Sequence, residues 1–112
     1  RKLGDEHPST LASIHNLGIL LRDQGKLDEA EPLLRESLEV RRRKLGDARP
    51  ETLTSAFNLG ILFLHQGKLD EAEKFARELI GERPETDIWR VRGKKLLDDI
   101  AKDRKKKGDK SP

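Results

Sequence analysis

Residues 24–31 read Gln-Gly-Lys-Leu-Asp-Glu-Ala-Glu, and residues 66–73 read the same eight residues in the same order. The match extends outward: a shift of 42 residues aligns Arg1–Asp5 with Arg43–Asp47 and makes 25 of 42 aligned positions identical. A fixed period between about 20 and 50 residues is typical of solenoids that stack one supersecondary unit. The sequence therefore predicts repeats that pack on one another in chain order.

Apolar residues within each repeat recur at intervals of three and four, which is the spacing of one helix face. Pro8 suits the first turn of this helix, and Gly25 comes where the helix must end and reverse. A second helix is expected to begin near Leu27, and near Leu69 in the next repeat, with acidic residues that favour a helix N-terminus. Each repeat is thus predicted to be a first and a second helix. The apolar positions of the first helices are Leu11, Ile14, Leu17, Leu20 and Leu21, then Leu53, Ala56, Leu59, Leu62 and Phe63.

The second helix of the first repeat is expected to run to about Lys44. Its basic end, Arg41–Lys44, complements the negative end of the helix dipole, and Gly46 lets the chain turn. Pro32 falls inside this helix, where a missing N–H predicts a small bend or a displaced start.

Composition limits the classes of protein that remain. Of 112 residues, 40% are charged and 33% are hydrophobic, which favours layered amphipathic helices over a sandwich or barrel. The absence of Cys excludes a disulfide framework and a thiolate metal site, and agrees with a reducing compartment. No apolar run approaches the roughly 20 residues that span a bilayer. We therefore expect a cytoplasmic protein.

The motif residues resemble the tetratricopeptide repeat family, whose pattern is a bulky residue, a Leu-Gly pair and an aromatic, with Ala and a large apolar residue on the partner helix. Gly18 with Ala30, and Gly60 with Ala72, would let paired helices approach closely. The 42-residue period and the Leu-Gly-x-x-x-Pro connection are similar to the kinesin light chain variety. The matching positions are Ile14, Leu17, Gly18, Leu21, Ala30 and Leu34, then Ala56, Leu59, Gly60, Phe63, Ala72 and Ala76.

This resemblance implies an all-α fold, an α-solenoid of antiparallel helix pairs with two repeat units and a C-terminal capping helix. The expected parts are 1–5 as the end of a truncated preceding repeat, 6–45 and 46–82 as the two units, 83–107 as the capping helix and 108–112 as a disordered tail. The first five residues copy the end of a repeat, so we expect the chain to begin within an array.

A weaker third unit is expected after the second. Trp89, Gly93 and Leu96 reproduce the spacing of a first helix 33 residues after Ala56, Gly60 and Phe63. Its partner helix is missing, so one helix from Glu85 to about Lys106 should cover the end of the stack with a polar outer face.

In this family, ligands bind a concave groove lined by the first helices, and an Asn before the Leu-Gly pair often faces it. The resemblance makes Asn16 and Asn58 candidates for gripping a peptide backbone, and basic residues on the last helix would favour an acidic or carboxylate-bearing peptide. The alternative for both Asn residues is a hydrogen bond between helices that fixes repeat geometry. The candidate groove residues are His15, Asn16, Ile19, Phe57, Asn58, Ile61, Arg90 and Lys94.

Catalysis and metal binding find little support in the sequence. His7, His15 and His65 are dispersed, and none has a second His or a Cys at ligand spacing. No phosphate-binding loop or nucleophile elbow occurs, and paired acids are explained by helix starts. We therefore predict no enzyme, no metal site and no cofactor.

Three functions remain open. The favoured one is a scaffold that binds a protein or peptide partner. The second is a structural spacer that stacks end to end, including a homodimer through an exposed N-terminal helix face. The third is attachment of the basic end, Lys102 and Arg104–Lys107, to nucleic acid or an anionic surface, which the absence of aromatic residues there disfavours.

Overall fold

The computed structural model describes residues 8–108, with only the backbone at Pro8 and Ser9. This part of the chain contains helices and no strand, which confirms the predicted all-α class. The expected repeat end at 1–5, His7, and residues 109–112 of the expected tail lie outside it. Within it, no helix has both the length and the apolar character to cross a membrane. The helices are α1 (Pro8–Asp23), α2 (Leu27–Leu45), α3 (Pro50–Gln66), α4 (Leu69–Ile80) and α5 (Ile88–Lys106).

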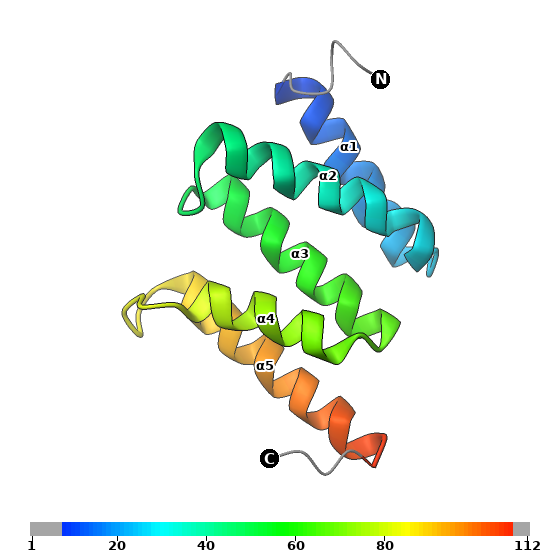
Figure 1. The fold of residues 1–112 in the computed structure, drawn as a ribbon, viewed down its shortest axis with the longest axis vertical. Helices are drawn as coiled ribbons and strands as arrows, with labels where there is room; N and C mark the ends of the chain where they lie inside the picture. The colour runs from blue at the N-terminus through cyan, green and yellow to red at the C-terminus, as the bar shows by residue number, and fades with distance from the viewer. Residues whose placement is uncertain (1–7, 109–112) are drawn as a thin grey trace.

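The helices stack in chain order as a solenoid. The first helices α1, α3 and α5 run in one direction, and the second helices α2 and α4 cross them in return (Figure 1). In addition to contacts between consecutive helices, α1 touches α3 and α3 touches α5, whereas the backbones of α2 and α4 stay further apart. The stack is therefore tighter on the side of the first helices, which makes that side the concave one. Its extents of 47 × 33 × 17 Å describe an elongated slab.

A glycine lies in the turn between the two helices of each pair. Gly67 ends α3 in the left-handed conformation, with φ at 76°. The N–H of Gly67 donates to the carbonyl of Leu64 at 3.1 Å, and the N–H of Lys68 donates to that of Phe63 at 2.8 Å. Gly25 repeats this turn after α1 with φ at 81°. Because glycine adopts positive φ without a Cβ clash, the repeated Gln-Gly-Lys-Leu sequence reverses the chain at both places.

One apolar core runs through the stack. At its centre the ring of Phe63 stacks on that of Phe75, with centroids 5.8 Å apart. A Cβ added to Gly60 would lie 2.9 Å from Cδ2 of Leu96 and 3.2 Å from the Cβ of Phe75. The small residue thus lets α3 and α4 approach closely, but at Phe75, whereas the predicted partner Ala72 comes no nearer than 4.0 Å, through its carbonyl oxygen. The buried cluster comprises Ala30, Leu34, Leu38, Leu53, Ala56, Leu59, Leu62, Phe63, Ala72, Phe75, Ala76, Leu79, Leu96 and Ile100.

The close approach at Gly18 involves different residues from those predicted. The atoms nearest to a Cβ built there belong to Leu34, at 2.7 Å, and to Leu33. Ala30, the predicted partner, is fully buried but is not among the nearest atoms. The fully buried Leu34 thus fills the space that Gly18 leaves open.

The last helix begins at Ile88, three residues later than predicted. The carboxylate of Asp87 accepts a hydrogen bond from the N–H of Trp89 at 2.8 Å, which is the geometry of an N-cap. Pro84 precedes this cap in the connection, and its carbonyl accepts from the N–H of Asp87 at 2.9 Å. The local cap therefore sets the start of α5.

The register of α5 also differs from the predicted one. On α3, Thr52 donates to the carbonyl of Arg41 at 3.4 Å, and the hydroxyls of Ser55 and Ser37 lie 3.1 Å apart. These contacts define where a first helix meets the second helix before it.

On α5, Arg90 and Gly93 lie at the positions that correspond to Thr52 and Ser55 on α3. Arg90 donates to the carbonyl of Arg83, the repeat counterpart of Arg41, at 3.1 Å. A Cβ on Gly93 would lie 3.0 Å from the Cβ of Leu79, the counterpart of Ser37. Gly93 therefore takes the place of Ser55, not that of Gly60 as the spacing of 33 residues predicted. The backbone of α4 fixes this, because the same Cβ would lie 2.8 Å from the carbonyl oxygen of Ala76.

In this register the outer face of α5 carries charged residues. The residues of α5 in the places of Ala56, Gly60 and Phe63 are Lys94, Asp98 and Ala101, and all three are exposed. Val91, in the place of Leu53, is also exposed, so this face combines charged residues with an apolar one. The charged residues on this face agree with the predicted capping helix, which stays a prediction.

Candidate interaction groove

The exposed side of α3 carries an apolar stripe. Phe57, Ile61 and Leu64 follow one another at intervals of four and three residues and are half-buried. Their neighbours on either side, such as Leu59 and Phe63, are buried against α2 and α4. Because the other faces of α3 are covered, this stripe is the apolar surface that the central first helix exposes on the concave side.

Two residues of α5 extend the stripe at its N-terminal end. Trp89 meets Phe57 edge to face, with ring centroids 6.5 Å apart and planes at 68°. The guanidinium of Arg92 lies 4.8 Å from the centroid of Trp89 and 5.9 Å from that of Phe57. Such cation–π contacts contribute about 0.5–1 kcal/mol at exposed sites. They hold a positive charge beside two aromatic rings while Arg92 stays exposed.

A cavity of about 390 Å³ continues the stripe at its other end. It lies between the C-terminal halves of α3 and α5, and we call the whole surface from Trp89 to this cavity the α3–α5 groove. The cavity is lined by Leu64, His65, Asp99, Lys102, Asp103, Lys106 and Lys107.

The groove has an excess of positive charge. Asp99 is paired with Lys95 at 2.7 Å, and Asp103 is paired with Lys107 at 3.1 Å. Both acids in the cavity wall are thus compensated by basic residues of α5 and its C-cap. Lys102 and Lys106 add positive charge to the same wall, and Arg92 adds it at the other end. Apolar side chains between basic ones suit an extended acidic segment with large apolar residues.

Arg90 and Lys94, predicted to line the groove, lie elsewhere. Arg90 reaches the carbonyl of Arg83, and Lys94 lies 3.8 Å from the carboxylate of Glu85, so both face the connection between α4 and α5. The register of α5 explains the difference. With Gly93 against α4, the residue turned towards Phe57 is Arg92.

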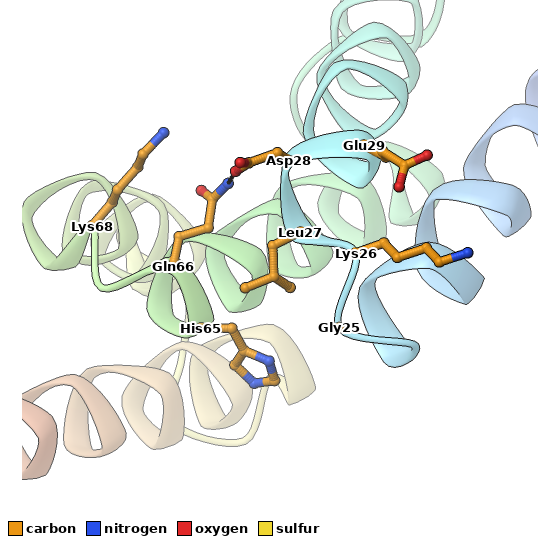
Figure 2. A pocket seen from close by; sticks show the side chains of 8 residues that line it. All are labelled: Gly25, Lys26, Leu27, Asp28, Glu29, His65, Gln66 and Lys68. Atoms are coloured by element: carbon orange, nitrogen blue, oxygen red, sulfur yellow. Dashed lines mark hydrogen bonds between the residues drawn. The ribbon is translucent and has the colours of Figure 1, made fainter.

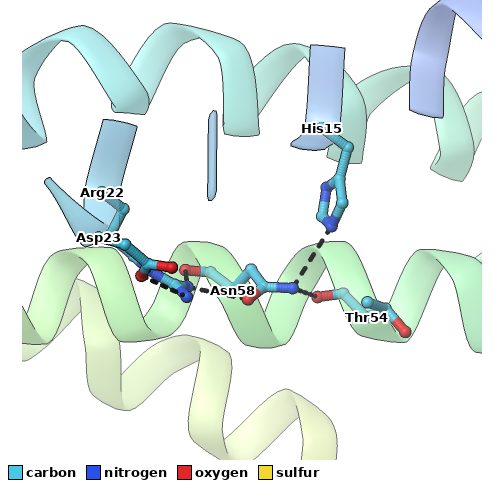
Figure 3. Close-up of polar contacts among 5 residues, drawn as sticks. All are labelled: His15, Arg22, Asp23, Thr54 and Asn58. Carbon is cyan, nitrogen blue, oxygen red and sulfur yellow. Dashed lines mark hydrogen bonds and ion pairs between the residues drawn. The ribbon is translucent and has the colours of Figure 1, made fainter. Parts of the chain in front are cut away.

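Asn58 is buried between repeats (Figure 3). Its amide nitrogen donates to the carbonyl of Thr54 at 2.9 Å and approaches Nε2 of His15 at 3.4 Å. Its oxygen accepts from Nη1 of Arg22 at 2.8 Å. Every polar atom of this side chain is engaged, and two of the three partners come from α1. The geometry agrees with the structural alternative for Asn58.

His15 is also buried, although the sequence predicted that it lines the groove like its repeat counterpart Phe57. Its Nδ1 lies 3.3 Å from the hydroxyl of Ser37, and its Nε2 faces the amide of Asn58. Burial lowers the pKa of His15 to about 4, and the charges of Arg41 and Arg22 lower it further in the same direction. A neutral ring suits the contacts, since Nε2 can then accept from Asn58 while Nδ1–H donates to Ser37.

The two remaining predicted residues lie on α1. Ile19, the counterpart of Ile61, is half-buried and packs against the core. Asn16, the counterpart of Asn58, is exposed. The structure thus keeps Phe57 and Ile61 together in the groove and separates Asn16, Arg90 and Lys94 from them.

A second cavity, of about 550 Å³, opens where the turn between α1 and α2 meets the end of α3 (Figure 2). Gln66 donates to Oε1 of Glu31 at 3.0 Å and to Asp28 at 3.4 Å, and Lys68 pairs with Glu31 at 3.1 Å. Burial would raise the pKa of Glu31, but hydrogen bonds from Arg35, Gln66 and Lys68 lower it to about 2. These contacts tie α2 to the end of α3. The cavity is lined by Gly25, Lys26, Leu27, Asp28, Glu29, His65, Gln66 and Lys68.

The basic end of α5 is partly used within the fold. Arg104 donates to Glu73 and to Asp70, each at 2.6 Å, and thereby joins α5 to the start of α4. Within residues 8–108, no group of three His, Cys, Asp or Glu residues is placed to hold a metal ion.

Sequence reasoning missed Trp89 and Arg92 as groove residues. From the sequence, Trp89 is only part of the weak third unit, and Arg92 has no predicted role. The single Trp, with an Arg one helical turn after it, was the signal that could have indicated both residues.

The fold defines an α-helical repeat array with a groove on its concave side. A model of the tetratricopeptide repeat matches residues 9–80, which is more than half of the chain. The chain therefore belongs to the tetratricopeptide repeat family, whose members are generally protein–protein interaction modules. Among curated proteins, none matches the chain.

Proposed function

We propose that this chain is a protein–protein interaction scaffold that binds an extended peptide in the α3–α5 groove. The observation that carries the proposal is the contact of Arg92 with Phe57 and Trp89. It places an exposed cation and half-buried aromatic rings at one end of an apolar stripe on the concave side.

The chemistry of the groove defines the partner. Phe57, Ile61 and Leu64 offer an apolar track, where large side chains of a peptide gain about 25 cal/mol for each Å² removed from water. Arg92 at one end and Lys102 at the other offer charge-assisted hydrogen bonds to carboxylates. We therefore expect a segment that carries acidic residues on both sides of a large apolar one.

The proposal can be tested by selecting a random displayed peptide library on the full chain. We expect the selected peptides to share acidic residues next to Leu, Phe or Ile. The affinity of one selected peptide is then measured by calorimetry for the wild type and for Arg92→Glu. Charge reversal at Arg92 should weaken binding about tenfold or more, which corresponds to at least 1.4 kcal/mol.

Lys94→Glu is the matched control, because it makes the same charge change on the same helix but on the side of the α4–α5 connection. Its affinity should stay within about twofold of the wild type. Equal losses in both variants would mean that only the net charge of the chain matters, and selected peptides without acidic residues would contradict the proposed partner.

A second candidate is a structural element that stacks on further helices. The observation in its favour is the exposure of Leu17 and Leu20 on α1, at 49% and 52%. Sedimentation across a range of concentrations tests whether two copies associate through this face. If they do, the wild type should form a homodimer and Leu17→Lys should be a monomer.

We also infer that the repeats are of the kinesin light chain type. The support is the 42-residue period, the 19-residue α2 and the Leu45-Gly46-x-x-x-Pro50 connection. Replacing this connection with a shorter one from a 34-residue repeat should disturb the packing of α3 on α2, which a lowered melting temperature would show.

A further inference from the structure

A further cavity, of about 270 Å³, opens between the two second helices α2 and α4. On α3, Leu59 at its base follows Phe57 by two residues, which is a rotation of about 200° around the helix axis. The cavity therefore lies on the convex side of the stack, opposite the α3–α5 groove, and shares no lining residue with it. It is lined by Arg35, Leu38, Glu39 and Arg42 of α2, Leu59 of α3 and Phe75 of α4.

The floor of this convex cavity is apolar. Leu38, Leu59 and Phe75 are buried there, one from each of three helices. Sites for whole small molecules usually enclose about 300–1,000 Å³. A cavity just below that range, with three apolar side chains beneath it, suits one large apolar side chain of a partner.

Two guanidinium groups lie beside the floor, about two turns apart on α2. That of Arg35 lies 5.0 Å from the ring centroid of Phe63, and that of Arg42 lies 5.9 Å from the centroid of Phe75. Both residues also line the cavity, so an aromatic ring that enters it would meet a cation on two sides. Guanidinium groups attract aromatic rings by stacking and by cation–π contacts, which are strongest with Trp.

Carboxylates hold both guanidinium groups in place. Arg35 donates from Nε to Glu31 at 2.8 Å. Arg42 pairs with Glu78 of α4, and its Nε lies 3.5 Å from the carboxylate of Asp47. Side chains that are already ordered lose less conformational freedom when a ligand binds. The cavity is therefore prepared for a ring before the ring arrives.

Two of the residues that build the cavity depart from the repeat. The counterpart of Arg42 in the next repeat is Pro84, and the counterpart of Phe75 in the previous one is Leu33. The helix α4 ends at Ile80, before it reaches the position of Pro84. Residues that the stacking of repeats requires recur at both places, so the packing of helix on helix does not explain this pair.

We propose that the convex cavity is a second docking site, which takes an aromatic side chain of a partner protein. The ring would lie on the apolar floor between Arg35 and Arg42. The carboxylate of Glu39 lies at the same cavity and can accept the indole N–H, which favours Trp. A partner bound there leaves the concave side open, so the chain could hold two proteins at once, and the proposal does not depend on the α3–α5 groove.

A second copy of this chain is a poor source of the ring. The chain has three Phe, one Trp and no Tyr. Phe63 and Phe75 are buried in the core. Phe57 and Trp89 are half-buried and contact each other. Since none of these rings projects from the surface, the aromatic side chain has to come from a different protein.

The test is a titration of the full chain with N-acetyl-tryptophanamide, followed by the amide signals in NMR spectra of the isotope-labelled protein. We expect a dissociation constant on the order of millimolar, as suits a single side chain, with the largest changes at Leu38, Glu39 and Phe75. N-acetyl-leucinamide has the same backbone without the ring, and it should bind at least about threefold more weakly.

Arg35→Gln should weaken the binding of N-acetyl-tryptophanamide about two- to fivefold, because one cation–π contact is lost. Arg77→Gln is the matched control. Arg77 is the repeat counterpart of Arg35 and pairs with Glu73 four residues earlier, as Arg35 pairs with Glu31, but it does not line the cavity. Their side chains are 64% and 53% exposed. The control variant should bind as the wild type does.

Five results would overturn the proposal. N-acetyl-tryptophanamide could cause no change, or N-acetyl-leucinamide could bind equally well. The two Arg variants could weaken binding equally, which would make net charge the cause. The largest changes could fall on Phe57 and Ile61, which would place the ring in the α3–α5 groove. The same changes could also appear when the chain alone is concentrated, which would assign the cavity to a second copy.

Discussion

At the scale of single residues, the contacts between repeats depend on a few buried polar groups. His15 and Asn58 lie where α1 meets α3, and Ser37 joins them to α2. A buried polar group that loses its partner costs about 1–3 kcal/mol. This small network therefore fixes how one repeat sits on the next, and it requires an uncharged imidazole.

The first prediction follows from the pKa of His15, which is about 4 in the folded chain and near 6.5 when unfolded. As the pH falls from 6.5 towards 4, the unfolded chain binds a proton that the folded chain does not. The free energy of unfolding should therefore decrease, by about 2 kcal/mol between pH 7 and pH 5. Urea unfolding at a series of pH values measures it.

His15→Gln should flatten this pH dependence. Glu31 does not confuse the result, because its pKa is lowered from 4.5 to about 2 and its stabilisation is lost only below pH 4.5. Equal slopes in wild type and His15→Gln would show that another group titrates.

Gly93→Ala is the second prediction. Its new methyl group would lie 2.8 Å from the carbonyl oxygen of Ala76, which belongs to the backbone of α4 and cannot move alone. Overpacking costs about 1–3 kcal/mol and exceeds the helix propensity gained, which is about 1 kcal/mol. We expect a net loss of about 1 kcal/mol in urea unfolding, while the exposed Lys94→Ala should change stability by less than about 0.5 kcal/mol. A stabilised Gly93→Ala would contradict the assigned register of α5.

At the scale of elements, helix ends determine what the sequence could foretell. The repeated Gln-Gly-Lys-Leu turns predicted the ends of α1 and α3 and the starts of α2 and α4 within a residue or two. The start of α5 was misjudged because Asp87, its N-cap, belongs to no repeated motif. The bend expected at Pro32 stays a prediction.

The third prediction concerns this cap. Asp87→Ala removes the acceptor for the N–H of Trp89 and should lower the free energy of unfolding by about 1 kcal/mol. Asp87→Asn keeps an acceptor and should remain within a few tenths of a kcal/mol of the wild type. Thermal unfolding followed by circular dichroism distinguishes the two, and equal losses would mean that the charge, not the cap, is what matters.

The groove was harder to predict than the helices. Phe57 and Ile61 followed from the position of the Leu-Gly pair, because a first helix has only one uncovered side. Asn58 could not be placed in the same way, since its partners His15 and Arg22 stand 43 and 36 residues earlier. Arg92 depended on the register of α5 against α4, which a weak repeat does not determine.

At the scale of the whole molecule, stability should decrease from the middle of the stack towards α1. In repeat arrays each layer is stabilised mainly by its neighbours. The central helix α3 contacts all four others, whereas α1 is covered on one side only. Amide hydrogen exchange should accordingly be slowest in α3, and it should be faster in α1 than in α5. Exchange as slow in α1 as in α3 would mean that the exposed side of α1, with Leu17 and Leu20, is covered in solution.

The position of Trp89 beside Phe57 also means that intrinsic tryptophan fluorescence should report on the groove. Trp89 is the single Trp of a chain that has no Tyr, so its emission is not mixed with that of any other strong fluorophore. It is half-buried at one end of the groove, with the guanidinium of Arg92 over its ring. A ligand that displaces Arg92 or excludes water there would change the wavelength and intensity of this emission. Binding in the groove could therefore be followed without a label.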